Sequence, residues 1–66
     1  MVYRKVAMVS VPEQSMIIVC NKFGHEYKTA TVDTVDGHIV TYYEGRSKRT
    51  ALEHVSMILA RTMLED

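Results

Sequence analysis

Cationic side chains surround the start of a helix that the sequence predicts in the last third of the chain. Arg46, Lys48 and Arg49 flank Ser47, a good N-cap residue because its hydroxyl can accept a hydrogen bond from an unpaired backbone N–H group of the first turn. The start of a helix is the positive end of its dipole, where each added cation costs about 0.3–1 kcal/mol. Free N–H groups flanked by cations can bind an anion such as phosphate. The sequence therefore predicts a phosphate site here, and exposed, screened charges without a ligand are the alternative.

The far end of the same predicted helix carries the opposite charge. Glu65 and Asp66 would lie at the negative end of the dipole, which is also unfavourable. A sequence selected for stability alone would exchange the two groups of charges. The arrangement therefore favours a function for the cations.

The other titratable residues lack the spacing of a catalytic or metal site. No two of His25, His38 and His54 are four positions apart, the spacing by which one helix brings two imidazoles to a metal ion. The lone Cys20 excludes an internal disulfide and a zinc site built from cysteines. A chain this small has little room for a pocket that excludes water from a reacting centre. We therefore expect no enzymatic activity, no metal or cofactor, and no small-molecule substrate.

Size and composition indicate one small folded domain. The chain has 66 residues, of which 47% are hydrophobic and 24% are charged. Such a chain buries only about 60% of its unfolded surface, so the core is thin and dimerisation would add buried area. Eight basic and eight acidic residues cancel, so binding to nucleic acid must come from a local cluster of charges. The longest apolar run, residues 16–20, is too short to span a membrane, and the N-terminus lacks signal-peptide features, which predicts a cytoplasmic protein.

The pattern of residues predicts strands followed by a helix. Residues 2–11, 27–35 and 38–43 have strand composition, and Asp36-Gly37 is typical of a two-residue hairpin turn. Residues 16–20 favour a further strand, with a short helix in residues 12–24 as the alternative, and residues 21–26 have loop composition. Apolar residues recur at helical spacing after Ser47: Ala51, Leu52, Val55, Ile58, Leu59, Thr62 and Met63. The predicted fold is α+β, an antiparallel meander of three or four strands packed against one C-terminal helix.

Neighbouring tyrosines offer a second kind of contact. Tyr42 and Tyr43 follow each other on a predicted strand, so we expect one ring under the helix and the other on the open face of the sheet, near Tyr27. An exposed tyrosine can stack on a base or anchor a protein interface. Packing of tyrosine against threonine across strands is the alternative.

Short motifs follow one another between residues 24 and 64. Gly24-His25 precedes a predicted strand, Asp36-Gly37 forms a tight turn, and Gly45-Arg46-Ser47-Lys48-Arg49-Thr50-Ala51 begins the helix, with the small residues Val55-Ser56 one turn later. In this order they resemble the last two strands and final helix of a double-stranded RNA-binding domain. The resemblance implies that His25 reads the minor groove and that Lys48 and Arg49 hold phosphates across the major groove. The sequence departs from the family at Leu52, where a further lysine is expected.

Two functions follow as expectations. The first is a small non-enzymatic module that contacts nucleic-acid phosphates, duplex RNA in particular, through Arg46, Ser47, Lys48 and Arg49, with His25 added by the resemblance. Other cations would widen the patch if the fold brings them to it: Arg4, Lys5, Lys22 and Lys28. The second is a protein-interaction module without nucleic-acid binding, either a homodimer or a compact inhibitor or adaptor of the kind that viral and accessory genes encode, which for a virus would act in the host cytoplasm.

Overall fold

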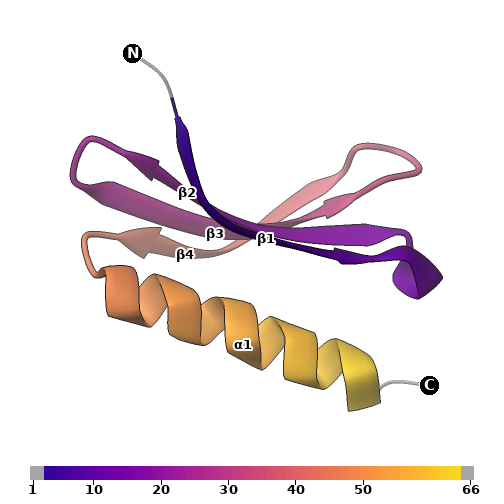
Figure 1. The fold of residues 1–66 in the computed structure, drawn as a ribbon. Coiled ribbons are helices and arrows are strands. Elements are labelled where there is room, and N and C mark those ends of the chain that lie inside the picture. The colour runs from indigo at the N-terminus through magenta and orange to yellow at the C-terminus, as the bar shows by residue number, and fades with distance from the viewer. Residues whose placement is uncertain (1–2, 65–66) are drawn as a thin grey trace.

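The chain folds into an antiparallel sheet of four strands with a helix against one face, described for residues 3–64 in a computed structural model (Figure 1). The strands lie in chain order: β1 (Arg4–Val11), β2 (Met16–Phe23), β3 (Glu26–Asp33) and β4 (Ile39–Gly45). The short 3-10 turn η1 (Pro12–Gln14) joins β1 to β2, and α1 (Lys48–Leu64) follows β4. The predicted α+β meander with a C-terminal helix is confirmed. The predicted acidic helix end, Glu65 and Asp66, lies outside the described residues.

The second strand is longer than the sequence predicted. The alternative of a helix in residues 12–24 is wrong beyond η1, because β-branched residues continue as β2. The predicted loop over residues 21–26 is also wrong in length, since pairing between β2 and β3 continues to Phe23 and Glu26. Only Gly24 and His25 remain unpaired, and Gly24 has φ +60°. A glycine at the first position of a two-residue turn fits the twist of a hairpin.

The hairpin between β3 and β4 has a four-residue loop in place of the predicted two-residue turn. The N–H of Asp33 donates to the carbonyl of His38 over 2.8 Å, which closes the loop of residues 34–37. The Asp33 carboxylate accepts hydrogen bonds from the N–H groups of Val35 and Asp36, at 2.7 and 3.2 Å. These bonds turn the chain out of the ladder at Asp33, so β3 ends before the predicted residue 35.

The core lies between the sheet and α1. It is built from small and β-branched side chains of β2 and α1: Ile18, Cys20, Ala51, Val55 and Ile58. A buried hydrogen bond, 2.9 Å long, runs from the Thr29 hydroxyl in β3 to the Ala51 carbonyl in α1. A small residue at Ala51 permits this close approach, which fixes the first turn of the helix against the sheet.

The predicted placement of the two neighbouring tyrosines on opposite faces is wrong. The register shifts in β4, because Tyr43 pairs with Thr29 whereas Thr41 pairs with Ala30, and Tyr42 is the extra residue of a bulge. Tyr43 packs against the core and stacks on His54 with the ring centres 5.2 Å apart. Tyr42 borders Met16 and Ile58, and Tyr27 packs against the core. All three tyrosines therefore lie on the helix side of the sheet.

Candidate nucleic-acid interface

The strand order brings the cations to one end of the molecule. The start of β1, the end of β2, the start of β3, the end of β4 and the start of α1 lie together at what we call the basic end (Figure 1). Apart from Arg61, every lysine and arginine of the chain is part of these segments: Arg4, Lys5, Lys22, Lys28, Arg46, Lys48 and Arg49. The opposite, acidic end carries Glu13, Asp33 and Asp36 beside Arg61. Glu26, Glu44 and Glu53 also lie at or beside the basic end, so the two ends differ in net charge, with more cations than carboxylates at one and more carboxylates than cations at the other.

Four cations of the basic end surround one depression, which we call the basic hollow. Its volume is about 310 Å³, and its lining comes from β1, β2, β3 and α1: Arg4, Lys5, Val6, Lys22, Tyr27 and Lys48. The Lys22 ammonium lies 5.5 Å from the centre of the Tyr27 ring, which holds the cation over the aromatic face. Because Tyr27 packs against the core, Lys22 rests on a fixed support.

A second depression adjoins the basic hollow. It has a volume of about 450 Å³ and is lined by Lys22, His25, Tyr27 and Arg46. Lys22 and Tyr27 line both depressions, so cationic groups continue from β1 and α1 to the turn that carries His25. The predicted site residues Arg46, Lys48 and His25 therefore share this surface.

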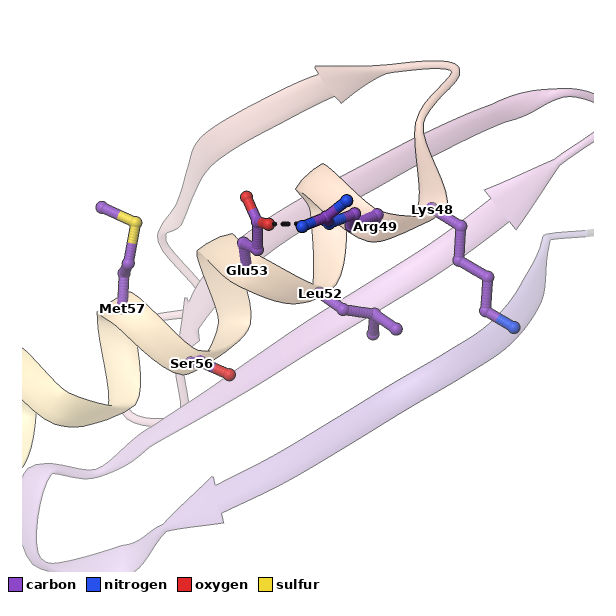
Figure 2. A pocket seen from close by; sticks show the side chains of 6 residues that line it. All are labelled: Lys48, Arg49, Leu52, Glu53, Ser56 and Met57. Carbon is purple, nitrogen blue, oxygen red and sulfur yellow. Dashed lines mark hydrogen bonds and ion pairs between the residues drawn. The ribbon is translucent and has the colours of Figure 1, made fainter.

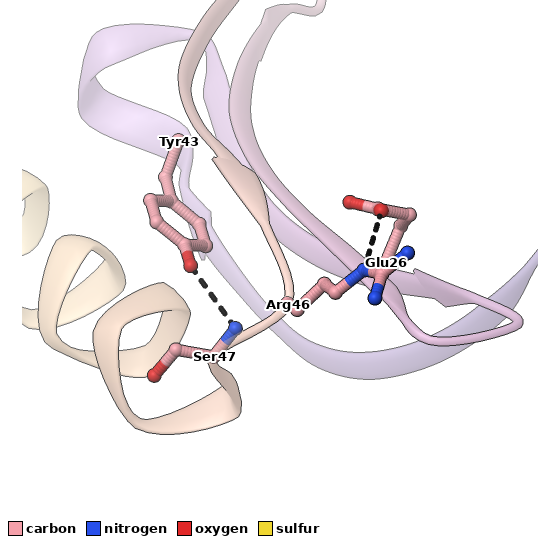
Figure 3. Close-up of polar contacts among 4 residues, drawn as sticks. All are labelled: Glu26, Tyr43, Arg46 and Ser47. Atoms are coloured by element: carbon pink, nitrogen blue, oxygen red, sulfur yellow. Dashed lines mark hydrogen bonds and ion pairs between the residues drawn. The ribbon is translucent and has the colours of Figure 1, made fainter.

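Two of the predicted cations form ion pairs with carboxylates. Arg49 Nε lies 3.3 Å from Glu53 Oε1 one turn along α1 (Figure 2). Arg46, which follows β4, has its Nε 3.3 Å from Oε1 of Glu26, the first residue of β3 (Figure 3). All four side chains are largely exposed, and exposed ion pairs contribute only about 0.2–1 kcal/mol. Figure 2 shows Lys48 and Arg49 pointing to different sides of the helix. Arg49 is therefore peripheral to the basic hollow, whereas Lys48 is part of it.

The predicted N-cap is confirmed. The Ser47 Oγ accepts a hydrogen bond of 3.1 Å from the N–H of Thr50, and the N–H of Ser47 donates to the Tyr43 hydroxyl over 3.1 Å (Figure 3). Within residues 3–64, the N–H groups of Lys48 and Arg49 have no acceptor. The helix start can thus offer two N–H groups to an anion, which is fewer than the start of a helix without a cap would offer.

Sequence reasoning missed parts of this surface. Tyr27 was expected near the open face of the sheet, but it lies on the helix side and lines both depressions. Lys28 lies on the other sheet face, where it lines a groove with Val19 and Ala30. The position of Lys22 on the helix side could have been predicted from the sequence. Lys22 follows Cys20 by two residues on β2, and residues two apart on a strand lie on the same face of the sheet.

The chain just before the helix start requires a glycine at position 45, because a side chain there would collide with the ring of Tyr43. An added Cβ would lie 2.6 Å from the Tyr43 Oη and 2.9 Å from the ring carbon Cζ. The ring cannot turn aside without losing its stacking on His54 and its hydrogen bond from Ser47. We expect Gly45→Ala to lower the free energy of unfolding by about 1–2 kcal/mol, measured by urea denaturation. In a Tyr43→Ala background the same change should cost nothing, and an equal cost in both backgrounds would contradict this explanation.

Neither a membrane-crossing helix nor a cluster of metal-binding side chains occurs in the described part of the chain. α1 is too short and too polar to cross a bilayer, and residues 3–64 contain no group of three or more His, Cys, Asp or Glu placed to hold a metal ion. No family model matches this sequence, and no curated protein or solved structure matches it significantly.

Proposed function

We propose that the protein is a non-enzymatic module that binds the phosphate backbone of nucleic acid through its basic end. The observation that carries this proposal is the convergence of four cations from separate elements on the basic hollow. Among residues 3–64, no carboxylate forms an ion pair with Arg4, Lys5, Lys22 or Lys48. Cations that face one another without counter-charges repel, and a polyanion relieves that repulsion when it binds.

The shape of the surface supports recognition of backbone rather than of base sequence. The two depressions share Lys22 and Tyr27, so successive phosphates of one strand can occupy them. Tyr27 is half-buried under Lys22, which leaves few side chains free to reach base edges. Contacts with phosphates fix position and supply affinity, whereas sequence is read at the base edges.

Duplex RNA is the nucleic acid that we propose as partner. The resemblance to double-stranded RNA-binding domains assigns His25 to a minor groove and Lys48 to the phosphates beyond it. In that family a helix precedes the first strand and supplies a further RNA contact. Here β1 stands in that position, and Arg4 and Lys5 would make the contact instead. The free, buried thiol of Cys20 is compatible with the reducing cytoplasm as the place of action.

The salt dependence of binding tests this function. For duplexes, the logarithm of the binding constant falls against that of salt concentration with a slope of about −0.9 per phosphate contact, so the four cations of the basic hollow predict about −3 to −4. Arg4→Gln should make the slope shallower by about 1, whereas Arg61→Gln at the acidic end should leave it unchanged. Fluorescence anisotropy with labelled duplex RNA, duplex DNA and single-stranded RNA of equal length measures both.

Either of two results would reject the proposal. One is a complex whose affinity does not change with salt, because backbone contacts must release counterions. The other is an equal effect of Arg4→Gln and Arg61→Gln, which would mean that the basic hollow has no special part in binding. Tighter binding to duplex DNA or to single strands than to duplex RNA would reject duplex RNA as the partner. It would still support the basic end as the surface that binds nucleic acid.

A further inference from the structure

The sheet face opposite α1, which we call the open face, is covered by no element within residues 3–64 (Figure 1). Apolar residues align across it from strand to strand. Met8 pairs with Val19, which pairs with Ala30, and Ile17 pairs with Val32, which pairs with Ile39. Large apolar side chains remain more than half exposed on it, at 51% for Met8, 58% for Ile39 and 58% for Tyr3. Contiguous exposed apolar surface of this kind marks an interface.

A groove crosses the open face. It has a volume of about 240 Å³, and Ala30, only 4% exposed, lies at its floor between the exposed side chains of Tyr3 and Ile39. Figure 1 shows the start of β1 and the β3–β4 hairpin both bending away from the helix, so two diagonal corners of the sheet rise on this side. A second twisted sheet, turned over, fits such a surface because raised corners meet lowered ones.

We propose that a second copy of this chain covers the open face, in a face-to-face dimer whose two-fold axis runs across the strands. Four strands about 4.8 Å apart, with eight residues rising about 3.3 Å each, give a face of roughly 500 Å². Two such faces bury roughly 1,000 Å², which reaches the lower limit for a specific protein interface. The fully buried core of one copy is small, so the added apolar area matters to its stability.

The separation of charge selects a second copy and its direction. A two-fold axis across the strands places the basic end of one copy over the acidic end of the other, so that Lys5 approaches the end that carries Glu13, and Lys28 approaches the end that carries Asp36. An axis along the strands would instead place the two basic ends side by side. The basic end keeps an excess of cations although Glu44 pairs with Lys28 and Glu26 lies beside it, so the ends are opposite in net charge. On that net charge, the open face is complementary to itself in only one of these arrangements.

The oligomeric state of the whole chain tests the dimer. Size-exclusion chromatography with light scattering should give twice the chain mass of 7.6 kDa. Ile39→Lys should weaken dimerisation at least tenfold and yield monomers, because it places an unpaired charge in the apolar interface. Met57→Lys is the matched control, since Met57 is 57% exposed on α1, and it should leave the dimer intact. Circular dichroism checks that both variants fold.

Cross-linking tests the direction of the two copies. After light-nitrogen and heavy-nitrogen chains are mixed, a zero-length carbodiimide should join Lys28 of one copy to Asp36 of the other, seen by mass spectrometry as isotope-mixed peptides. Isotope-mixed links between two basic ends would overturn the proposed axis. A monomer at every concentration, or a dimer that survives Ile39→Lys and Met8→Lys, would overturn the interface itself. None of these outcomes depends on whether the protein binds nucleic acid.

Discussion

Combining Lys22→Glu with Lys48→Glu is expected to weaken nucleic-acid binding by at least about 60-fold at 0.1 M salt, because each phosphate contact contributes close to an eightfold factor relative to 1 M salt. Both lysines line the basic hollow, from β2 and from α1. The two new carboxylates would also repel the phosphates, so the loss should exceed that of the corresponding glutamine variants. Anisotropy titrations with labelled duplex RNA measure the effect.

The control for this experiment reverses a charge outside the basic end. Arg61→Glu changes the only arginine or lysine near the acidic end and should alter affinity by less than about threefold, since it makes no phosphate contact. The double variant should unfold at nearly the temperature of the unmodified chain, because Lys48 is exposed and Lys22 is half-buried at the surface. Unchanged affinity in a folded double variant would disprove the role of the basic hollow.

Ile18→Ala should have the largest effect on stability, since Ile18 is fully buried, with 0% of its surface exposed, in the centre of the core. Truncating a buried isoleucine costs about 2–5 kcal/mol through lost burial and the cavity left behind. A chain of this length has a total stability of about 3–10 kcal/mol, so a large fraction of the variant would unfold. Urea denaturation followed by circular dichroism measures the change.

Leu64→Ala provides the comparison for Ile18→Ala. It removes the same number of carbon atoms from a residue that is 84% exposed, and it should cost less than about 0.5 kcal/mol. Similar costs for the two truncations would mean that α1 and β2 do not enclose the core in solution.

The order of elements could be predicted from the sequence because periodicity and composition are local. Two successive isoleucines and a valine favoured a strand at residues 16–20, and β2 confirms it. The turns were less predictable. Gly24-His25 was hidden within a polar segment, and the Asp36-Gly37 pair suggested a shorter turn than the one that forms once the Asp33 carboxylate binds two N–H groups. Such side-chain bonds compete with the ladder and have no periodic signature.

The candidate site was predictable only in part, for a similar reason. Ser47 and its cations could be recognised locally, since a cap and a helix start are defined by neighbouring residues. Arg4 pairs with Lys22 because of the register between β1 and β2. A bulge between Lys5 and Ala7 sets that register, and no feature of the sequence predicts the bulge. The bulge in β4 likewise moved Tyr42 to the helix side. Bulges arise from how strands fit one another, which is not a local property.

The molecule is several Debye lengths long, and this decides whether a chain without net charge can attract a polyanion. The longest dimension is 36 Å, and the strands and helix run along it (Figure 1). In 0.15 M salt the Debye length is about 8 Å, so Glu13 and Asp36 lie several Debye lengths away from anything that touches Lys22. A nucleic acid approaching the basic end would therefore encounter a surface on which cations outnumber carboxylates. At lower salt concentration the Debye length grows, and the acidic end would then repel the nucleic acid as well.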